Sequence, residues 1–145
     1  MSFQSTLMIT FDVWSTGKPL DLEVLIDSES VYSQTITTKT PVSIELNDDE
    51  ERTVSLEIIM KNKSTDHVVV GDSGEIIKDS MLKFSNIEID KINIEKIIWS
   101  QAKYTHDFNG SGNLIIENFY GLMGCNGVVK LDISTPIYQW LLEKI

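Results

Sequence analysis

The residue types that most often perform catalysis are scarce in this chain and poorly spaced for it. His67 and His106 are the only histidines, and neither belongs to a metal-binding spacing such as H-E-x-x-H. Cys125 is the only cysteine, which excludes an intrachain disulfide. It could act as a nucleophile only with a histidine beside it in space, and the flanking Gly124 and Gly127 favour a tight turn around a small thiol. We therefore expect no catalytic residue and no enzyme.

The glycine-rich segment 120–127 has no phosphate-binding pattern. It lacks the Lys-Ser/Thr pair that reaches phosphates, and a strand is expected to follow it, so no helix N-terminus is available. Its apolar side chains either fold back onto the core or meet another subunit, and an apolar loop at a surface is a candidate contact. Tyr and Met are also enriched in interface cores. We predict partner binding through this loop, by Tyr120, Leu122, Met123 and Asn126.

The acidic run at 47–51, Asn-Asp-Asp-Glu-Glu, gathers carboxylate oxygens of the kind that bind calcium. The run lacks the spaced D-x-[DN]-x-[DN]-G pattern of a calcium loop. As a solvated turn between two strands it needs no ligand. We therefore expect no metal site, and no motif in the sequence indicates a cofactor.

Aromatic side chains suggest a different chemistry, because flat exposed rings beside amide and carboxylate groups are typical of sugar-binding surfaces. The candidate platforms are Trp14, Tyr32, Trp99 and Tyr104. Trp14 follows Val13, so strand alternation predicts that its ring points away from the core, whereas Trp99 is expected in the core. We add Trp14 to the predicted partner-binding residues, with a glycan as a possible partner.

The composition favours one globular domain over residues 1–145. A chain of 145 residues, 41% of them hydrophobic, can bury roughly 70% of its unfolded surface without a disulfide or metal. Its 12 basic and 22 acidic residues give a formal charge of −10. Such a surface repels nucleic acid and anionic membranes but fits a basic patch on another protein. We also expect no secretory signal and no membrane span, since no apolar run approaches roughly 20 residues.

Apolar and polar residues alternate with period two through much of the chain, which predicts half-buried strands. The clearest cases are 7–14, 21–27, 41–46 and 53–61. Further β segments are expected at 29–36, 68–70, 75–77, 81–90, 91–100, 103–108, 114–120 and 128–134. Residues 71–74 form a Gly-containing hairpin turn, and the alternation slips in phase within 81–90, which indicates a β-bulge.

The segment at the C-terminus is predicted to form a helix. Thr135 is expected as its N-cap and Pro136 as its first residue. Ile137, Leu141 and Ile145 then fall on one face and, with Trp140, should dock the helix on the sheets. The whole pattern predicts an all-β fold, a two-sheet antiparallel β-sandwich of jelly-roll-like form with a short C-terminal helix.

Five segments, spread in order over nearly the whole chain, resemble small virion proteins of contractile-tailed phages, especially phages of marine cyanobacteria. They are I-T-F-D at 9–12, S-T-G-K-P-L at 15–20, S-N-I-E-I-D at 85–90, H-D-F-N-G-S-G at 106–112 and F-Y-G-L-M-G-C-N-G at 119–127. The resemblance implies a sandwich that decorates or joins other virion proteins, in a particle assembled in the host cytoplasm. It implies no catalytic residue. Homo-oligomers remain an open alternative.

A second resemblance is to calcium-dependent carbohydrate-binding modules of the xylan-binding type. It rests on the strand segments 22–27, 54–62 and 87–90. The Asp-Asp and Asp-Arg-Asn calcium loops of such modules are not recognisable here, which fits the expectation of no metal. This resemblance implies the alternative function, a carbohydrate-binding module that serves host attachment.

Overall fold

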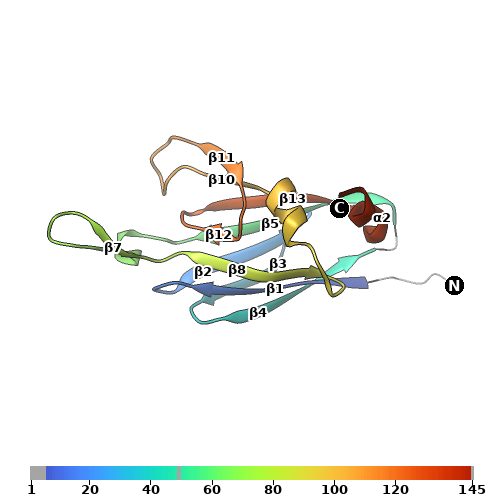
Figure 1. The fold of residues 1–145 in the computed structure, drawn as a ribbon, viewed down its shortest axis with the longest axis horizontal. Helices are drawn as coiled ribbons and strands as arrows, with labels where there is room; N and C mark the ends of the chain where they lie inside the picture. Colours follow the sequence, from blue (N-terminus) through green and yellow to red (C-terminus); the bar gives the residue numbers. More distant parts are fainter. Residues whose placement is uncertain (1–5, 49, 145) are drawn as a thin grey trace.

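Two antiparallel β-sheets packed face to face make up the protein (Figure 1). A computed structural model describes residues 6–48 and 50–144. Sheet A contains β12 (Leu122–Met123), β8 (Leu82–Ile89), β1 (Thr6–Ser15) and β4 (Thr40–Asn47) in that order, with β9 (Ile92–Asn93) beside β8. Sheet B contains β11 (Ile115–Asn118), β10 (Lys103–His106), β13 (Gly127–Thr135), β5 (Arg52–Lys61), β2 (Leu20–Ile26) and β3 (Glu29–Ile36). The predicted two-sheet sandwich is confirmed.

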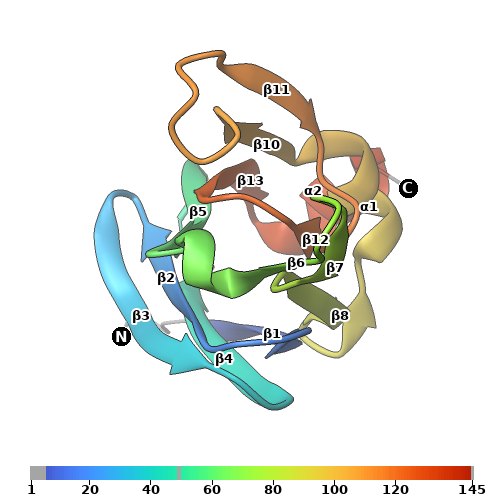
Figure 2. The same cartoon turned by 90° about the vertical axis from the view of Figure 1, so that its left-hand side faces the viewer.

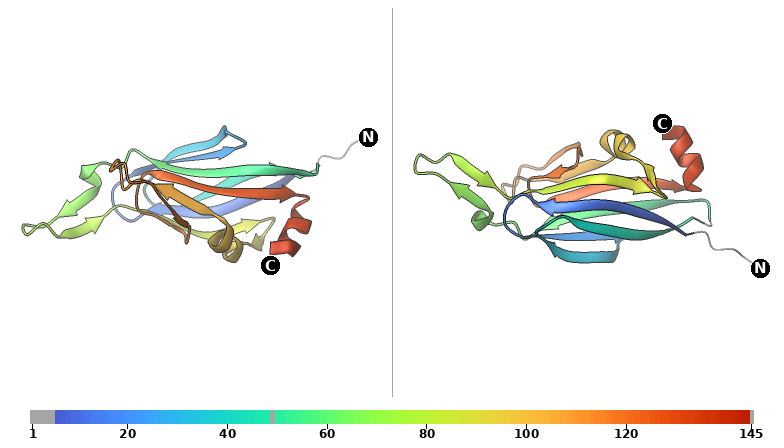
Figure 3. Two further views of the ribbon diagram at one scale, coloured as in Figure 1. Left: turned by 90° about the horizontal axis from the view of Figure 1, so that it is seen from above. Right: turned by 60° about the horizontal axis from the view of Figure 1, so that its bottom comes forward.

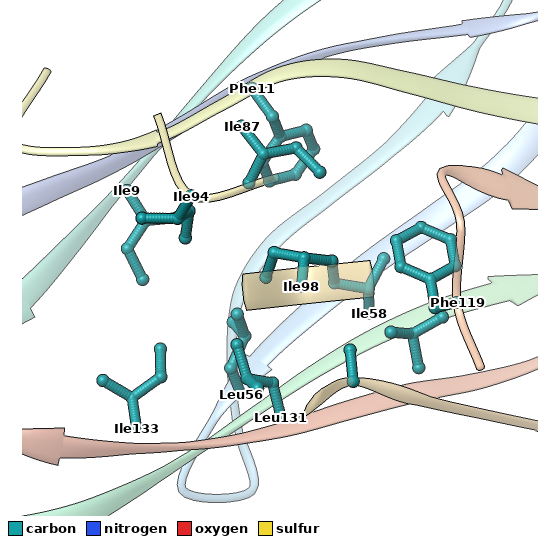
Figure 4. A pocket seen from close by; sticks show the side chains of 12 residues that line it. Ile9, Phe11, Leu56, Ile58, Ile87, Ile94, Ile98, Phe119, Leu131 and Ile133 are labelled. Atoms are coloured by element: carbon teal, nitrogen blue, oxygen red, sulfur yellow. The ribbon is translucent and has the colours of Figure 1, made fainter. Parts of the chain in front are cut away.

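The core lies between the sheets, as the period-two pattern predicts. Inward residues of β1 face inward residues of β5 and β13 across the sandwich, and they are nearly all buried aliphatic or aromatic side chains. Burial of this apolar surface is the main stabilising contribution to the fold. A small internal cavity of about 20 Å³ lies among these side chains and is lined only by apolar residues (Figure 4). It is too small for any ligand beyond the size of a water molecule.

Strand β8 contains the predicted irregularity. Its pairing with β1 shifts register between Thr10 and Asp12, which lie opposite Glu88 and Ser85. Asn86 falls inside this shift and has a φ of 54°. The extra residue of the bulge turns Asn86 toward the outside of sheet A, where it is exposed.

A hairpin of β6 (Val68–Val70) and β7 (Ile76–Asp79) projects beyond one end of the sandwich (Figures 1 and 3). The short 3-10 helix Thr65–His67 leads into it. Its turn is the predicted Gly-containing segment, with Gly74 at a φ of 85°. The base of the hairpin returns to the sandwich beside the turn that follows β1, because the Ser80 hydroxyl accepts a hydrogen bond from the Lys18 amide.

Helix α1 (Glu95–Gln101) corrects the prediction of a strand at 91–100. Its buried residues Ile97 and Ile98, with Ile94 just before the helix, follow the spacing of a helix face. The β-branched isoleucines favour a strand by propensity, but burial of this face decides the structure. The helix closes the side of the sandwich between β8 and β11 (Figure 2).

Helix α2 (Ile137–Lys144) is the predicted C-terminal helix, and Ile137, Trp140 and Leu141 are buried against the sandwich. Ile145 lies outside the described residues. The expected N-cap is wrong, because Thr135 ends β13 and its hydroxyl donates to the Glu50 carbonyl. Asp48 accepts the Ile137 amide hydrogen at 2.7 Å instead. Neither α1 nor α2 is long and apolar enough to cross a membrane.

Candidate functional site

Trp14 stands on the outer face of sheet A, as strand alternation predicts. Along β1 the buried positions alternate with more exposed ones, and the outward set is Met8, Thr10, Asp12 and Trp14. The Trp14 side chain is half-buried rather than fully exposed. A half-buried ring in this position presents part of its apolar surface to solvent.

Strand pairing brings two lysines to this ring. Lys83 of β8 is the register partner of Trp14, and directly opposed residues share one face of a sheet. Lys39 precedes β4 on the other side, and its Nζ lies 5.6 Å from the centroid of the Trp14 ring. Both lysines are exposed. The ring is therefore flanked by two cations that are distant from each other in the sequence.

A carboxylate and an amide lie one row further along the same face. Asp12 Oδ2 accepts a hydrogen bond from Asn86 Nδ2 at 2.9 Å and lies 3.8 Å from Lys39 Nζ. The amide reaches this position because of the bulge in β8. Sequence analysis missed Asp12, although alternation places it on the face of Trp14. It could not find Asn86 or the lysines, because their proximity depends on strand pairing.

Two open hollows lie along this face, and Asp12 lines the second of them. The first, of about 480 Å³, is lined by Trp14, Ser15, Gly17, Thr37, Thr38 and Lys39. The second, of about 390 Å³, has Thr10, Asp12, Ser43, Asn86 and Glu88 among its lining residues. An aromatic ring at one end and hydrogen-bonding side chains at the other provide both kinds of contact that a small polar ligand requires.

The turn below the first hollow is held rigidly. The Thr16 hydroxyl donates to the Asp79 carbonyl and accepts from the Met81 amide, each at 3.0 Å. The Ser80 hydroxyl accepts from the Lys18 amide at 2.8 Å, and Gly17 packs directly against Ser80. These bonds tie the turn after β1 to the base of the projecting hairpin, so the hollow is preformed.

A second surface lies where β11 and β12 end the two sheets. Exposed apolar side chains gather on this stretch of chain: Leu114, Ile116, Tyr120 and Leu122, at 67%, 67%, 66% and 40% exposure. The Tyr120 ring packs against the Trp99 ring of α1 with centroids 6.4 Å apart. We refer to these four residues with Trp99 as the apolar edge. Tyr120 and Leu122 are thus exposed as predicted, and their binding role stays a prediction.

Met123 corrects the prediction for this loop, because its side chain is fully buried. It belongs to β12 and pairs with Leu82 of β8, which also points into the core. In a strand, neighbouring side chains point to opposite faces, so Leu122 faces solvent and Met123 faces the core. A partner can contact Leu122 without reaching Met123.

Asn126 is held within the fold. Its Oδ1 accepts the Lys63 amide hydrogen at 2.8 Å, and its Nδ2 donates to the Lys63 carbonyl at 3.0 Å. The buried Lys63 ammonium in turn donates to Asp79 Oδ1 and to the Gly124 carbonyl, both at 2.6 Å. Its predicted partner contact would have to form beside these bonds, since they occupy both polar atoms of the amide.

The cysteine, the two histidines and Tyr104, which the sequence offered for catalysis or sugar binding, lie in structural contacts. The Tyr104 hydroxyl accepts the Cys125 amide hydrogen at 2.9 Å and donates to the Cys125 carbonyl. Burial raises the pKa of the Cys125 thiol, which keeps it protonated and weakly nucleophilic. His67 Nε2 lies 2.8 Å from the Pro19 carbonyl oxygen. His106 Nδ1 accepts a backbone amide hydrogen at 3.2 Å.

The acidic run does not assemble into a metal site among residues 6–48 and 50–144, where no three His, Cys, Asp or Glu side chains converge as around an ion. Asp48 is used by helix α2, and Asp49 lies outside the described residues.

Comparison with known proteins identifies the fold. No family model matches the chain, and no curated protein does. A solved structure of the SeMet form of vCBM60, described in work that links two families of calcium-dependent carbohydrate binding modules by circular permutation, superposes with a TM-score of 0.54. The two chains are 14% identical over 86% of this chain and 89% of that one. vCBM60 in complex with galactobiose gives 0.48 at 13% identity, over 87% and 99% of the respective chains. The sandwich of this protein is therefore of the kind seen in these modules.

Proposed function

We propose that this domain is a non-catalytic glycan-binding module that holds a saccharide on the outer face of sheet A. The observation that carries the proposal is the Trp14 ring beside the hydrogen-bonded pair of Asp12 and Asn86, along two adjoining hollows. The apolar face of a sugar ring packs on an aromatic side chain, and its hydroxyls pair with carboxylates and amides. The solved neighbour has a related fold and is described as a carbohydrate binding module, which makes saccharides the ligand class to test first.

The polar groups of this proposed site are positioned without a metal ion. Its polar groups come from β1 and β8 and are oriented by one another, with no cation needed to hold them. We therefore expect binding to persist in the presence of a chelator. The site also needs no catalytic pair, since recognition on an open face depends on contacts alone.

Binding to an array of immobilised saccharides tests the proposal. Wild-type protein should bind at least one saccharide, and Trp14→Ala should weaken that binding about tenfold, because an aromatic contact contributes roughly 0.5–1.5 kcal/mol beyond its buried area. Tyr120→Ala is the matched control, since it removes an exposed aromatic ring from the apolar edge and should leave binding unchanged. Absence of binding to every saccharide would remove the proposal.

As a second candidate we propose that the domain is a structural or accessory protein of a phage particle, incorporated through the apolar edge. The supporting observation is the exposure of Tyr120 and Leu122, which line one hollow beside the edge of sheet A, together with that of Ile116 on the edge strand of sheet B, since exposed apolar patches mark contact sites. The two candidates meet at one point, because Leu122 lies opposite Lys83 on the outer face of sheet A, and Lys83 in turn lies opposite Trp14.

Incorporation into purified particles that lack the native copy tests the second candidate. Leu122→Asp should fold but fail to incorporate, because a buried unpaired charge is excluded from an interface core. Val31→Asp is the control, since Val31 is 47% exposed on β3, at the opposite edge of sheet B. Incorporation of the Leu122→Asp variant at the wild-type level would exclude the apolar edge from the contact.

A further inference from the structure

The charges on the outer face of sheet A are separated along its length. Lys39 and Lys83 flank Trp14 at one end, whereas Glu45 and Glu88 lie toward the other, beside Met8 and Thr10. At an ionic strength near 0.15 M, charges influence each other over about 8 Å. The Trp14 end therefore differs in potential from the carboxylate end of the same face.

Two more lysines lie beside the hollow at the Trp14 end. Lys18 follows Gly17 in the turn that lines the hollow. Lys78 runs alongside that turn, with its Cε 3.4 Å from the point that a Cβ on Gly17 would occupy. Four of the 12 basic residues of a chain with net charge −10 thus lie beside the Trp14 ring or in and beside the turn next to it.

The carboxylates of Asp12 and Asp79, near this end, already have partners within the protein. Asp12 pairs with Asn86 and Lys39, and Asp79 pairs with Lys63. Lys83 has no ion-pair partner among residues 6–48 and 50–144. A ligand at this end therefore meets a cation with no internal counter-ion.

The position of Lys39 bears on the charge of the ligand. The Lys39 ammonium lies over the Trp14 ring and near Asp12. A sugar that packs on this ring must displace Lys39, whose side chain is 61% exposed. A neutral sugar provides no anionic partner for the displaced ammonium. A sugar that carries an anionic group gives it a new partner, between Lys39 and Lys83.

From this arrangement we infer that the ligand of the Trp14 face is an acidic saccharide, whose carboxylate or sulfate group lies between Lys39 and Lys83 while its ring packs on Trp14. This inference rests on the proposed glycan-binding function and specifies its ligand class. Asp12 and Asn86 then bind hydroxyls of the adjoining sugar unit, away from the anionic group.

The test uses paired probes on the intact protein. Each uronate-containing, sialylated or sulfated oligosaccharide is presented beside its neutral counterpart, prepared by carboxyl reduction or desulfation. The acidic member of a pair should bind and the neutral member should bind at least tenfold more weakly. Raising the salt concentration from 0.05 to about 0.5 M should weaken the acidic interaction, since exposed charge pairs are screened.

Lysine variants locate the anionic group. Lys39→Ala and Lys83→Ala should each weaken binding of the acidic probe about fivefold, the upper range for an exposed ion pair. Lys39→Ala should leave a neutral probe unchanged or bound more tightly, because it uncovers the ring. Lys130→Ala is the control, since it removes the same charge from an exposed position on sheet B. All variants should keep the wild-type melting temperature.

The outcomes separate this inference from the function on which it rests. Equal binding of neutral and acidic probes, with Trp14→Ala defective and the lysine variants normal, overturns the acidic ligand and leaves glycan binding intact. Binding of neither member of any pair overturns both. Displacement of the acidic saccharide by poly-glutamate at equal charge concentration overturns the saccharide as the ligand, because the face would then respond to charge alone.

Discussion

The outer face of sheet A and the apolar edge both present an aromatic ring to solvent, but the two rings have different neighbours. Trp14 is flanked by Lys39 and Lys83 and lies one row from the Asp12–Asn86 pair. The Tyr120 ring packs against Trp99 and lines a hollow with Leu122, and only its hydroxyl meets a polar side chain, that of Asn118. Exposure of an aromatic side chain therefore does not by itself identify a ligand. The neighbours do, since polar partners suit a hydroxyl-rich ligand and apolar partners suit another protein surface.

The two surfaces also differ in their connection to the core. Successive ring contacts, with centroids 5.6, 5.5, 5.9 and 6.4 Å apart, join Phe11, Phe84, Phe119, Trp99 and Tyr120. A change at the apolar edge can therefore disturb the interior through packed side chains. Trp14 has no such ring contact among the described residues, and its neighbours are exposed lysines and surface polar groups. We expect the edge to be the more sensitive surface for stability.

The largest effect that this comparison predicts separates two adjacent residues of β12. Met123→Asp should destabilise the protein by about 3–5 kcal/mol or more, because it places an unpaired carboxylate in the core. Leu122→Asp should cost less than about 1 kcal/mol, since that side chain is exposed. Urea unfolding of the two variants measures the difference.

Equal stability of these two variants would contradict the placement of β12. A stable Met123→Asp protein would mean that Met123 faces solvent and that the loop 120–127 stands clear of the sandwich. A strongly destabilised Leu122→Asp protein would mean that the apolar edge belongs to the core. Either result would remove the distinction between the two surfaces.

Much of the fold follows from the alternation in the sequence. Strands β1 and β5 were predictable because one face of each is buried and the other is not, which imposes period two on the residues. The bulge in β8 was predictable for the same reason, since an extra residue inverts the phase of the pattern. The C-terminal helix was predictable from the spacing of Ile137 and Leu141.

The failures come from contacts between distant parts of the chain. Helix α1 replaces a predicted strand because Ile94, Ile97 and Ile98 bury one helical face, and tertiary burial overrides the strand propensity of isoleucine. Asp48 rather than Thr135 binds the first amide of α2, across 89 positions of sequence. No local pattern contains such a partner.

The candidate site was predictable only for its first residue. Alternation along β1 places Trp14 outside, and the same argument extends to Asp12, which it could have included. Lys83 and Asn86 join them only because β8 pairs with β1, and Lys39 because it precedes β4. A bulge one residue earlier or later would place a different side chain beside Asp12.

Two glycines, one beside each surface, allow the comparison to be tested by substitutions that disturb the backbone. Gly121 supports the apolar edge at a φ of 88°, and a Cβ there would lie 2.8 Å from the Trp99 ring and 3.2 Å from the Phe84 carbonyl oxygen. Gly121→Ala should therefore cost about 2 kcal/mol or more, from the left-handed backbone and the contact together. Saccharide binding should be unchanged, because the site on sheet A is not involved.

Substitution of Gly17 should destabilise the protein less than substitution of Gly121, but it should weaken saccharide binding more. A Cβ there would collide with Ser80 Oγ, so Gly17→Ala should displace that hydroxyl and break its bond with the Lys18 amide. The loss of one such hydrogen bond costs about 1 kcal/mol, and the loosened hollow beside Trp14 should bind its saccharide more weakly. Gly124→Ala is the control, since its Cβ would meet only Met81 Sδ at 3.6 Å, an ordinary contact. Thermal unfolding and saccharide titration of the three variants distinguish the two surfaces. A Gly17→Ala protein with unchanged affinity would mean that the turn after β1 does not shape the site.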